Sequence, residues 1–333
     1  MEIVPAIPEN NLNTNGSNVR RMTMTTLLFT HPVCLEHDTG DYHPECADRL
    51  KAVLAALEGE EFSALLREEA PHASIDQIGR AHPISHIDHV MSSVPESDSY
   101  HHLDPDTVLS RNSGEAALRA AGAVIAAVDA VAKGQARNAF CAIRPPGHHA
   151  ERDASMGFCL FNNAAIAALH ARDEHGFERV AVVDFDVHHG NGTQHIFWDE
   201  PGTFYASTHQ EHAYPGTGFL DETGGAGRIV NVPLPAGSGS DTFRQAFDDV
   251  ILPQLTKFAP DFVVISAGFD AHAADPLAHL RLKTADYGWV TRRLVEVAGA
   301  CAGNRIVSVL EGGYELNALA ASVREHVRAL MGN

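Results

Sequence analysis

Four potential metal ligands follow one another closely in the middle of the chain, directly after an apolar run. The run 180–183 is too short for a helix and does not alternate, which is typical of a strand buried in a parallel sheet. Asp184, Asp186, His188 and His189 come next. Because side chains alternate along extended backbone, Asp186 and His188 point to the same side and can share one divalent ion. A polar turn at a strand end is the alternative interpretation of this segment alone.

Three further apolar runs end in side chains of complementary chemistry. They are followed by Arg144-Pro-Pro-Gly-His-His149, by the segment 266–276 with Asp270 and Asp275, and by Glu311-Gly-Gly-Tyr314. Two carboxylates and one histidine are enough for a catalytic Zn²⁺ that keeps one position for water. A histidine of the pair can act as general base and later as acid, and Tyr314 can donate a hydrogen bond to a developing oxyanion.

Alternating strands and helices must position these segments. The expected strands are 26–30, 138–143, 180–185, 204–207, 229–232, 262–266 and 306–310, and the expected helices start near Ala47 or cover 114–133, 162–173, 190–198, 241–258 and 284–302. This pattern predicts an α/β fold with a mostly parallel central sheet and helices on both faces. Ligands bind where the carboxyl ends of such strands meet. No change of composition divides the chain, so we expect a single domain.

Composition and charge exclude several classes of function. The 333 residues are 44% hydrophobic and carry a formal net charge of −19, which gives a large core but no basic surface for nucleic acid or an anionic membrane. Five cysteines without a C-x-x-C pair are typical of a reducing compartment. No run reaches the ~20 apolar residues that span a bilayer. We therefore expect a cytoplasmic enzyme with a disordered extension over 1–24 and a catalytic domain over 25–333.

Six sequence motifs occur in an order known from one enzyme family. They are Arg144-Pro-Pro-Gly-His-His149, Gly157-Phe-Cys-Leu-Phe-Asn-Asn163, Asp184-Phe-Asp-Val-His-His-Gly-Asn-Gly192, Tyr214-Pro-Gly-Thr-Gly218, Gly268-Phe-Asp270 with Asp275-Pro276, and Glu311-Gly-Gly-Tyr314. Through them the chain resembles the histone deacetylase family, in its bacterial branch that is similar to the class II enzymes. The motifs are highly specific for the fold and the metal chemistry, and much less specific for the substrate.

The resemblance implies an arginase/deacetylase fold with two metal sites. One zinc ion per chain is expected on Asp186, His188 and Asp275. A structural potassium ion is expected at Asp184, Asp186 and His188, with backbone and hydroxyl oxygens of Ser207 and Thr208.

Catalytic roles also follow from the resemblance. His148 and His149 are the expected catalytic pair, and Tyr314 is the expected oxyanion donor. Asp184 should orient His148, while Asn191 stands where other branches carry an aspartate that faces His149. A neutral partner should leave His149 less basic than a carboxylate would.

Substrate contacts are implied in the same way. Phe158, with Gly157 beside it, and Tyr214 should flank a narrow tunnel for an acyl-lysine chain, and Leu277 should make the mouth of that tunnel apolar. Arg49 fits an arginine that the family places in an internal channel behind the metal.

The sequence leaves three readings of the function open. The leading one is a zinc amidohydrolase that removes acyl groups from amines, with acetyl-lysine, acetylpolyamines or small and foreign amides as substrates. A two-manganese ureohydrolase of the arginase type would need further bridging aspartates, and Gly190 and His272 stand in their places. An inactive metal-binding protein is the third reading. Homo-oligomer formation is possible for each.

Overall fold

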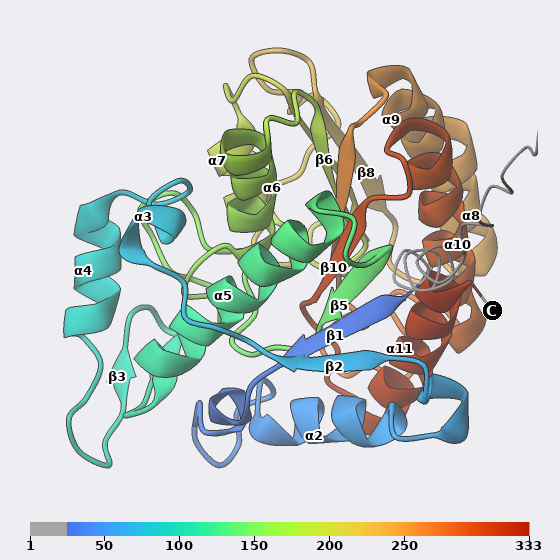
Figure 1. Cartoon of the computed structure of the whole chain (residues 1–333). Coiled ribbons are helices and arrows are strands. Elements are labelled where there is room, and N and C mark those ends of the chain that lie inside the picture. The colour runs from blue at the N-terminus through green and yellow to red at the C-terminus, as the bar shows by residue number, and fades with distance from the viewer. Residues whose placement is uncertain (1–24, 333) are drawn as a thin grey trace, which may run out of the picture.

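An eight-stranded parallel sheet forms the centre of the molecule (Figure 1). The computed structural model describes residues 25–332. The order across the sheet is β2-β1-β5-β10-β9-β6-β7-β8. Its strands are β1 (Thr26–Thr30), β2 (Leu66–Glu69), β5 (Asn138–Cys141), β6 (Val180–Asp184), β7 (Thr203–Gln210), β8 (Ile229–Leu234), β9 (Phe262–Ala267) and β10 (Ile306–Leu310). A separate antiparallel pair joins β3 (His101–His102) to β4 (Val108–Leu109). The predicted α/β class with a parallel sheet is confirmed.

Helices cover both faces of the sheet, as Figure 1 shows. One face carries α5 (Ser113–Ala132), α6 (Asn163–His175) and α7 (Asn191–Phe197), with α3 (Ile75–Ile78) and α4 (Ile84–Ser92) beyond them. The other face carries α2 (Ala47–Ala56), α8 (Ser240–Ala246), α9 (Leu252–Phe258), α10 (Thr284–Cys301) and α11 (Leu316–Met331). A π-helical turn over Phe247–Ile251 joins α8 to α9, so the helix predicted over 241–258 is continuous but not regular.

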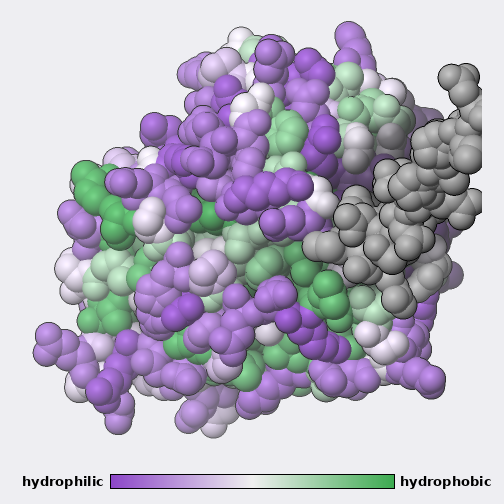
Figure 2. Space-filling model, viewed as in Figure 1, coloured by the Kyte–Doolittle hydropathy of each residue, from purple (hydrophilic) through white to green (hydrophobic). Residues whose placement is uncertain are grey.

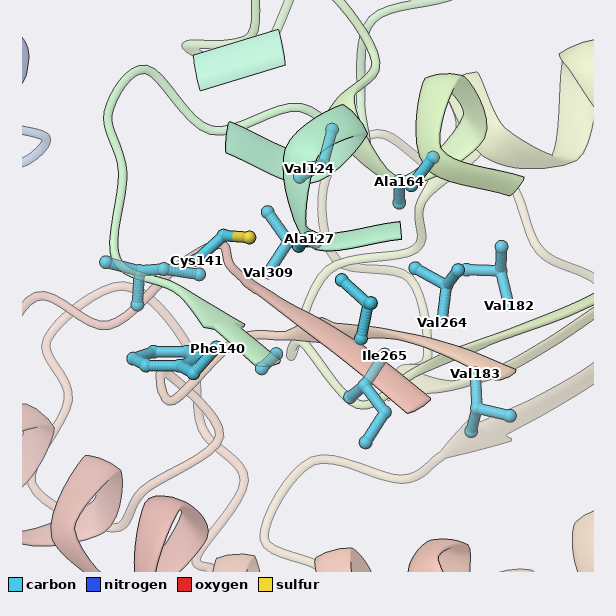
Figure 3. Packing of buried hydrophobic residues seen from close by; sticks show 14 of the residues in the cluster. Val124, Ala127, Phe140, Cys141, Ala164, Val182, Val183, Val264, Ile265 and Val309 are labelled. Carbon is cyan, nitrogen blue, oxygen red and sulfur yellow. The ribbon is translucent and has the colours of Figure 1, made fainter. Parts of the chain in front are cut away.

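The core lies on both sides of the central strands (Figure 3). Val124 and Ala127 of α5 and Ala164 of α6 lie on one side of the sheet, while Phe140 and Val183 lie on the other. The small side chains of the two alanines let their helices approach the sheet closely. All five residues of β6 are buried. This explains why the central strands show no alternation of apolar and polar residues in the sequence.

Several elements were not predicted, among them the strands β2, β3 and β4 and the helix α11. β2 has the sequence Leu-Arg-Glu-Glu, all four residues are exposed, and it pairs with β1 alone at the edge of the sheet. Such a strand carries no hydrophobic pattern and is formed by backbone pairing. α11 was missed although His326 and the apolar residues around it are buried against α10 and the sheet.

Hydrophilic residues cover most of the face shown in Figure 2, with smaller apolar areas at its left and near its centre. Within residues 25–332, no helix combines the length and the apolar character required to cross a membrane. The extension expected over 1–24 lies outside the described residues.

Candidate active site

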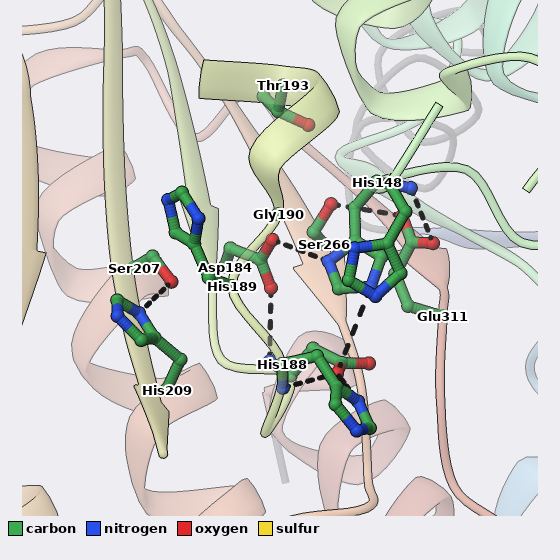
Figure 4. A network of polar contacts seen from close by, with 12 residues as sticks. His148, Asp184, His188, His189, Gly190, Thr193, Ser207, His209, Ser266 and Glu311 are labelled. Atoms are coloured by element: carbon green, nitrogen blue, oxygen red, sulfur yellow. Dashed lines mark hydrogen bonds and ion pairs between the residues drawn. The ribbon is translucent and has the colours of Figure 1, made fainter. Parts of the chain in front are cut away.

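The carboxyl ends of five adjacent strands bring the predicted residues together. β5, β10, β9, β6 and β7 are neighbours in the sheet. The four polar segments follow the first four of these strands, and β7 carries Ser207 and Thr208. Figure 4 shows that His148, Asp184, His188 and Glu311 reach the same region from the ends of three strands, β5, β6 and β10.

A buried set of two carboxylates and one imidazole lies at the ends of β6 and β9. Ligand atoms of Asp186, His188 and Asp270 lie within 4.8 Å of one another. Nδ1 of His188 is 3.1 Å from Oδ1 of Asp186 and 3.2 Å from Oδ2 of Asp270. These atoms are the types that zinc accepts.

The set has the properties of a cation site. Oδ2 of Asp270 is a buried oxygen with no hydrogen-bond partner among the described residues, although His188 Nδ1 is near it. Burial and the charge of Asp186 raise the pKa of Asp270 to about 7, because two buried carboxylates disfavour each other's charge. A cation between them would remove this penalty. A side chain at Gly268 would meet Asp186 Oδ2 at 2.0 Å, so the backbone must approach that carboxylate closely.

Asp275 does not belong to this set, which corrects the expected zinc ligands. Its Oδ2 accepts hydrogen bonds from the backbone N–H groups of Tyr314, at 2.7 Å, and of Glu315. Its Oδ1 accepts one from the N–H of Leu277. Asp275 therefore holds the turn that carries Tyr314, while Asp270, five residues earlier and directly after β9, faces the ligand pair.

The two histidines have different partners. Nδ1 of His148 lies 3.0 Å from Oδ2 of Asp184, and Nδ1 of His149 lies 2.8 Å from Oδ1 of Asn191, as expected. Burial alone would lower the pKa of His148, but Asp186 and Asp184 raise it to about 10. Burial and the neighbouring His148 lower the pKa of His149 well below its ordinary value of 6.5. His149 is therefore the neutral imidazole of the pair.

Glu311 supports the histidine pair, a role that the sequence did not indicate. Its Oε2 accepts hydrogen bonds from the N–H groups of Gly147, at 2.7 Å, and His148, and its Oε1 accepts one from Ser266 Oγ. Figure 4 shows this carboxylate beside His148. In the sequence, the Glu-Gly-Gly-Tyr motif indicates a role for the tyrosine only.

A buried ion-pair network anchors the segment that carries the histidines. Arg144 donates to both carboxylate oxygens of Glu45, at 2.5 and 2.8 Å, and Arg49 donates to Glu45 at 2.8 Å. All three side chains are fully buried. Burial alone would raise the pKa of Glu45, but Arg144 and Arg49 lower it well below 4.5.

We expect Glu45→Gln to lower the free energy of unfolding by about 3–5 kcal/mol, since it leaves two buried guanidinium groups with one neutral partner. Because the folded-state pKa of Glu45 is depressed, its contribution is present above pH 4.5 and is lost as the pH falls below that value. Urea denaturation from pH 2 to 8 measures both effects. Asp48→Asn, three positions along the chain, removes an exposed carboxylate and should change little. Equal losses in both variants would contradict the prediction.

Tyr314 lies between the internal arginine and the substrate side. Arg49 donates to the carbonyl oxygens of Gly313 and Glu311, and its guanidinium carbon lies 4.8 Å from the centre of the Tyr314 ring. Burial raises the pKa of Tyr314 well above 10. The phenol therefore keeps its proton and remains a hydrogen-bond donor.

Aromatic rings stand on two sides of the site. The Phe158 ring lies 6.0 Å from that of Tyr314, and the Tyr214 ring lies 5.1 Å from that of His149, centre to centre. Gly157 is buried beside His149, which a side chain there would meet at 2.5 Å. Leu277 is 40% exposed, consistent with an outer position.

Two carboxylates near the aromatic rings, Asp104 and Asp106, were not predicted from the sequence. Asp106 and Asp104 are among the causes that raise the pKa of Tyr214, after burial. Oδ1 of Asp106 accepts from the N–H of Gly157, and Oδ1 of Asp104 accepts from that of Asp106. They lie within residues 75–110, where the sequence shows little periodicity and no pattern points to them.

The residues expected around potassium are buried. Ser207 follows Tyr205 on β7, opposite Asp184 in the register, and its hydroxyl contacts His209. Oγ1 of Thr208 is buried and has no hydrogen-bond partner among the described residues.

The positions where a ureohydrolase would need aspartates are unsuited to them. A side chain at Gly190 would meet Oδ2 of Asp184 at 2.4 Å and the hydroxyl of Tyr205 at 2.5 Å. His272 is held through Nε2 by Thr284 Oγ1 at 3.2 Å.

Comparison with known proteins agrees with this geometry. The family model described as "Histone deacetylase domain" matches residues 43–330. "Histone deacetylase 14, chloroplastic" of Arabidopsis thaliana is 37% identical over 95% of this chain and 79% of its own length. "Histone deacetylase-like amidohydrolase" of Pseudomonas aeruginosa is 36% identical over 88% of this chain and 82% of its own length. The crystal structure of the HDA15 HD domain superposes with a TM-score of 0.88 at 36% identity, over 93% of this chain and 89% of that chain. The chain belongs to the histone deacetylase family, whose members are hydrolases that deacetylate amides.

Proposed function

We propose that this protein is a zinc-dependent hydrolase that removes acetyl or similar acyl groups from amines. The observation that carries the proposal is the convergence of Asp186, His188 Nδ1 and the unpaired Asp270 oxygen in a buried site beside the histidine pair. Zinc bound by these three residues would polarise the amide carbonyl and lower the pKa of a water molecule in its open position.

The chain's own residues would divide the remaining work. His149 is neutral, so it would accept the proton of the attacking water and later deliver it to the leaving amine. His148, between two carboxylates, would remain protonated and stabilise negative charge. Tyr314, whose hydroxyl stays protonated, would donate a hydrogen bond to the oxyanion. Potassium at Asp184, Asp186, His188, Ser207 and Thr208 would hold the end of β6 rigid.

Activity and metal content together test the proposal. The protein should bind one divalent ion per chain at this site and hydrolyse at least one of three substrates: an acetyl-lysine peptide, N8-acetylspermidine or a small N-methyl amide. Two ions with release of urea from a guanidino compound would support the ureohydrolase hypothesis, and metal without turnover would support the inactive one. Residence in the cytoplasm and homo-oligomer formation stay predictions.

We expect acetyl-lysine peptides or small amides to be preferred over acetylpolyamines. Rings at Phe158 and Tyr214 suit a slim uncharged chain, and Leu277 offers no charge for a second ammonium group. Asp104 and Asp106 are the acidic groups near Tyr214, but backbone N–H groups already engage both. Steady-state kinetics on the three substrates at low and high salt measure the preference. A kcat/KM for the polyamine that is the highest of the three at both salt concentrations would contradict this preference.

A further inference from the structure

A carboxylate lies behind the neutral partner of His149. Nδ2 of Asn191 donates a hydrogen bond to Oε1 of Glu151 at 2.7 Å, while Oδ1 of Asn191 lies 2.8 Å from Nδ1 of His149. Asn191 is buried, and the side chain of Glu151 is 32% exposed. Glu151, Asn191 and His149 thus form a chain of polar groups that leads from the surface to the site.

The carboxylate decides which way the amide of Asn191 points. An asparagine side chain can turn by half a rotation and present either its oxygen or its NH₂ group to a neighbour. Glu151 only accepts hydrogen bonds when it is ionised, so it selects the orientation in which the NH₂ group faces it. The amide oxygen must then face His149, which has to donate from Nδ1. The lone pair of His149 is thereby left on Nε2.

We propose that Glu151 is a positioning residue, which acts through Asn191 to fix the tautomer of His149 and supplies the negative charge that Asn191 lacks. This proposal rests on the proposed role of His149 as general base. His148 needs no such intermediate, because Asp184 contacts its Nδ1 directly at 3.0 Å. The two histidines therefore receive their negative partners at different distances, one directly and one through an amide.

Glu151→Gln tests the charge with little change of shape. A glutamine can present either oxygen or NH₂ to Asn191, so the orientation of Asn191 is no longer fixed. We expect kcat to fall by roughly 10-fold, a usual loss for an outer partner of a site residue, with KM, zinc content and Tm unchanged. Asp153→Asn is the matched control, because it removes an exposed carboxylate two positions along the same loop and should keep the wild-type kcat.

A charge exchange separates this role from a merely structural one. Asn191→Asp alone should also lower kcat, because it places a second carboxylate at hydrogen-bond distance from Glu151. In the double variant Glu151→Gln with Asn191→Asp, the NH₂ group of the glutamine can donate to the new aspartate, which again accepts from His149 Nδ1. The double variant should therefore be faster than either single variant.

The possible results either support or overturn the proposal. Two slow single variants and a faster double variant support it. It is overturned if Glu151→Gln behaves like Asp153→Asn, or if the double variant is slower than both single variants. A wild-type protein that hydrolyses none of the amide substrates would instead refute the proposed function.

Discussion

Replacing Asp270 by alanine is expected to yield a folded protein that binds no zinc and has no measurable hydrolase activity. The physical reason is the loss of one of three ligands in a buried site, which leaves Asp186 and His188 alone to hold the ion. Elemental analysis of the purified variant and an acetyl-lysine peptide assay check the two parts of the prediction, and circular dichroism checks the fold.

Asp275→Asn is the control for this experiment, because it alters the other carboxylate of the same segment. An asparagine keeps an oxygen that can accept from the Tyr314 N–H, so this variant should retain zinc. Full zinc occupancy in Asp270→Ala, together with loss of zinc from Asp275→Asn, would show that Asp275 and not Asp270 is the zinc ligand.

Tyr314→Phe should keep the zinc and the fold but lower kcat by roughly 10²- to 10³-fold, the scale of one lost oxyanion donor. The ring fills the same space, and the contact with Arg49 remains, so only the hydroxyl is removed. The effect should appear in kcat and in kcat/KM alike, because the bond to the oxyanion forms only in the transition state. Steady-state kinetics and elemental analysis provide the measurement.

Tyr100→Phe offers a matched loss of a hydroxyl at the surface, where it bonds to Asp38. It should leave kcat unchanged. An unchanged kcat in Tyr314→Phe with zinc still bound would assign oxyanion stabilisation to another group.

Elements that are buried in the fold could be predicted, because burial requires a recognisable pattern of apolar residues. β6 and β10 are fully buried, and their apolar runs predicted them well. β2 could not be found in this way, because its residues are exposed and its pairing with β1 depends on backbone groups alone. Which helices share a face depends on packing that no single segment encodes.

The site was predicted as a meeting of strand ends, which places His148, His149, Asp186, His188 and Tyr314 together. Sequence order could not show which of two aspartates five positions apart turns toward the ligand pair, since this depends on the path of the loop after β9. Partners such as Glu45, Glu151 and Glu311 belong to other segments, and only the folded chain reveals that they support the site.

The exposed strand β2 has a consequence for how the molecule behaves in concentrated solution. An open sheet edge presents unpaired N–H and C=O groups to which a second chain can add a strand. Here the edge is only four residues long, and Arg67, Glu68 and Glu69 place charges along it. Another copy that paired with β2 would have to desolvate these charged side chains. The same polar residues that prevent the prediction of this strand therefore also disfavour its pairing with a strand of another molecule.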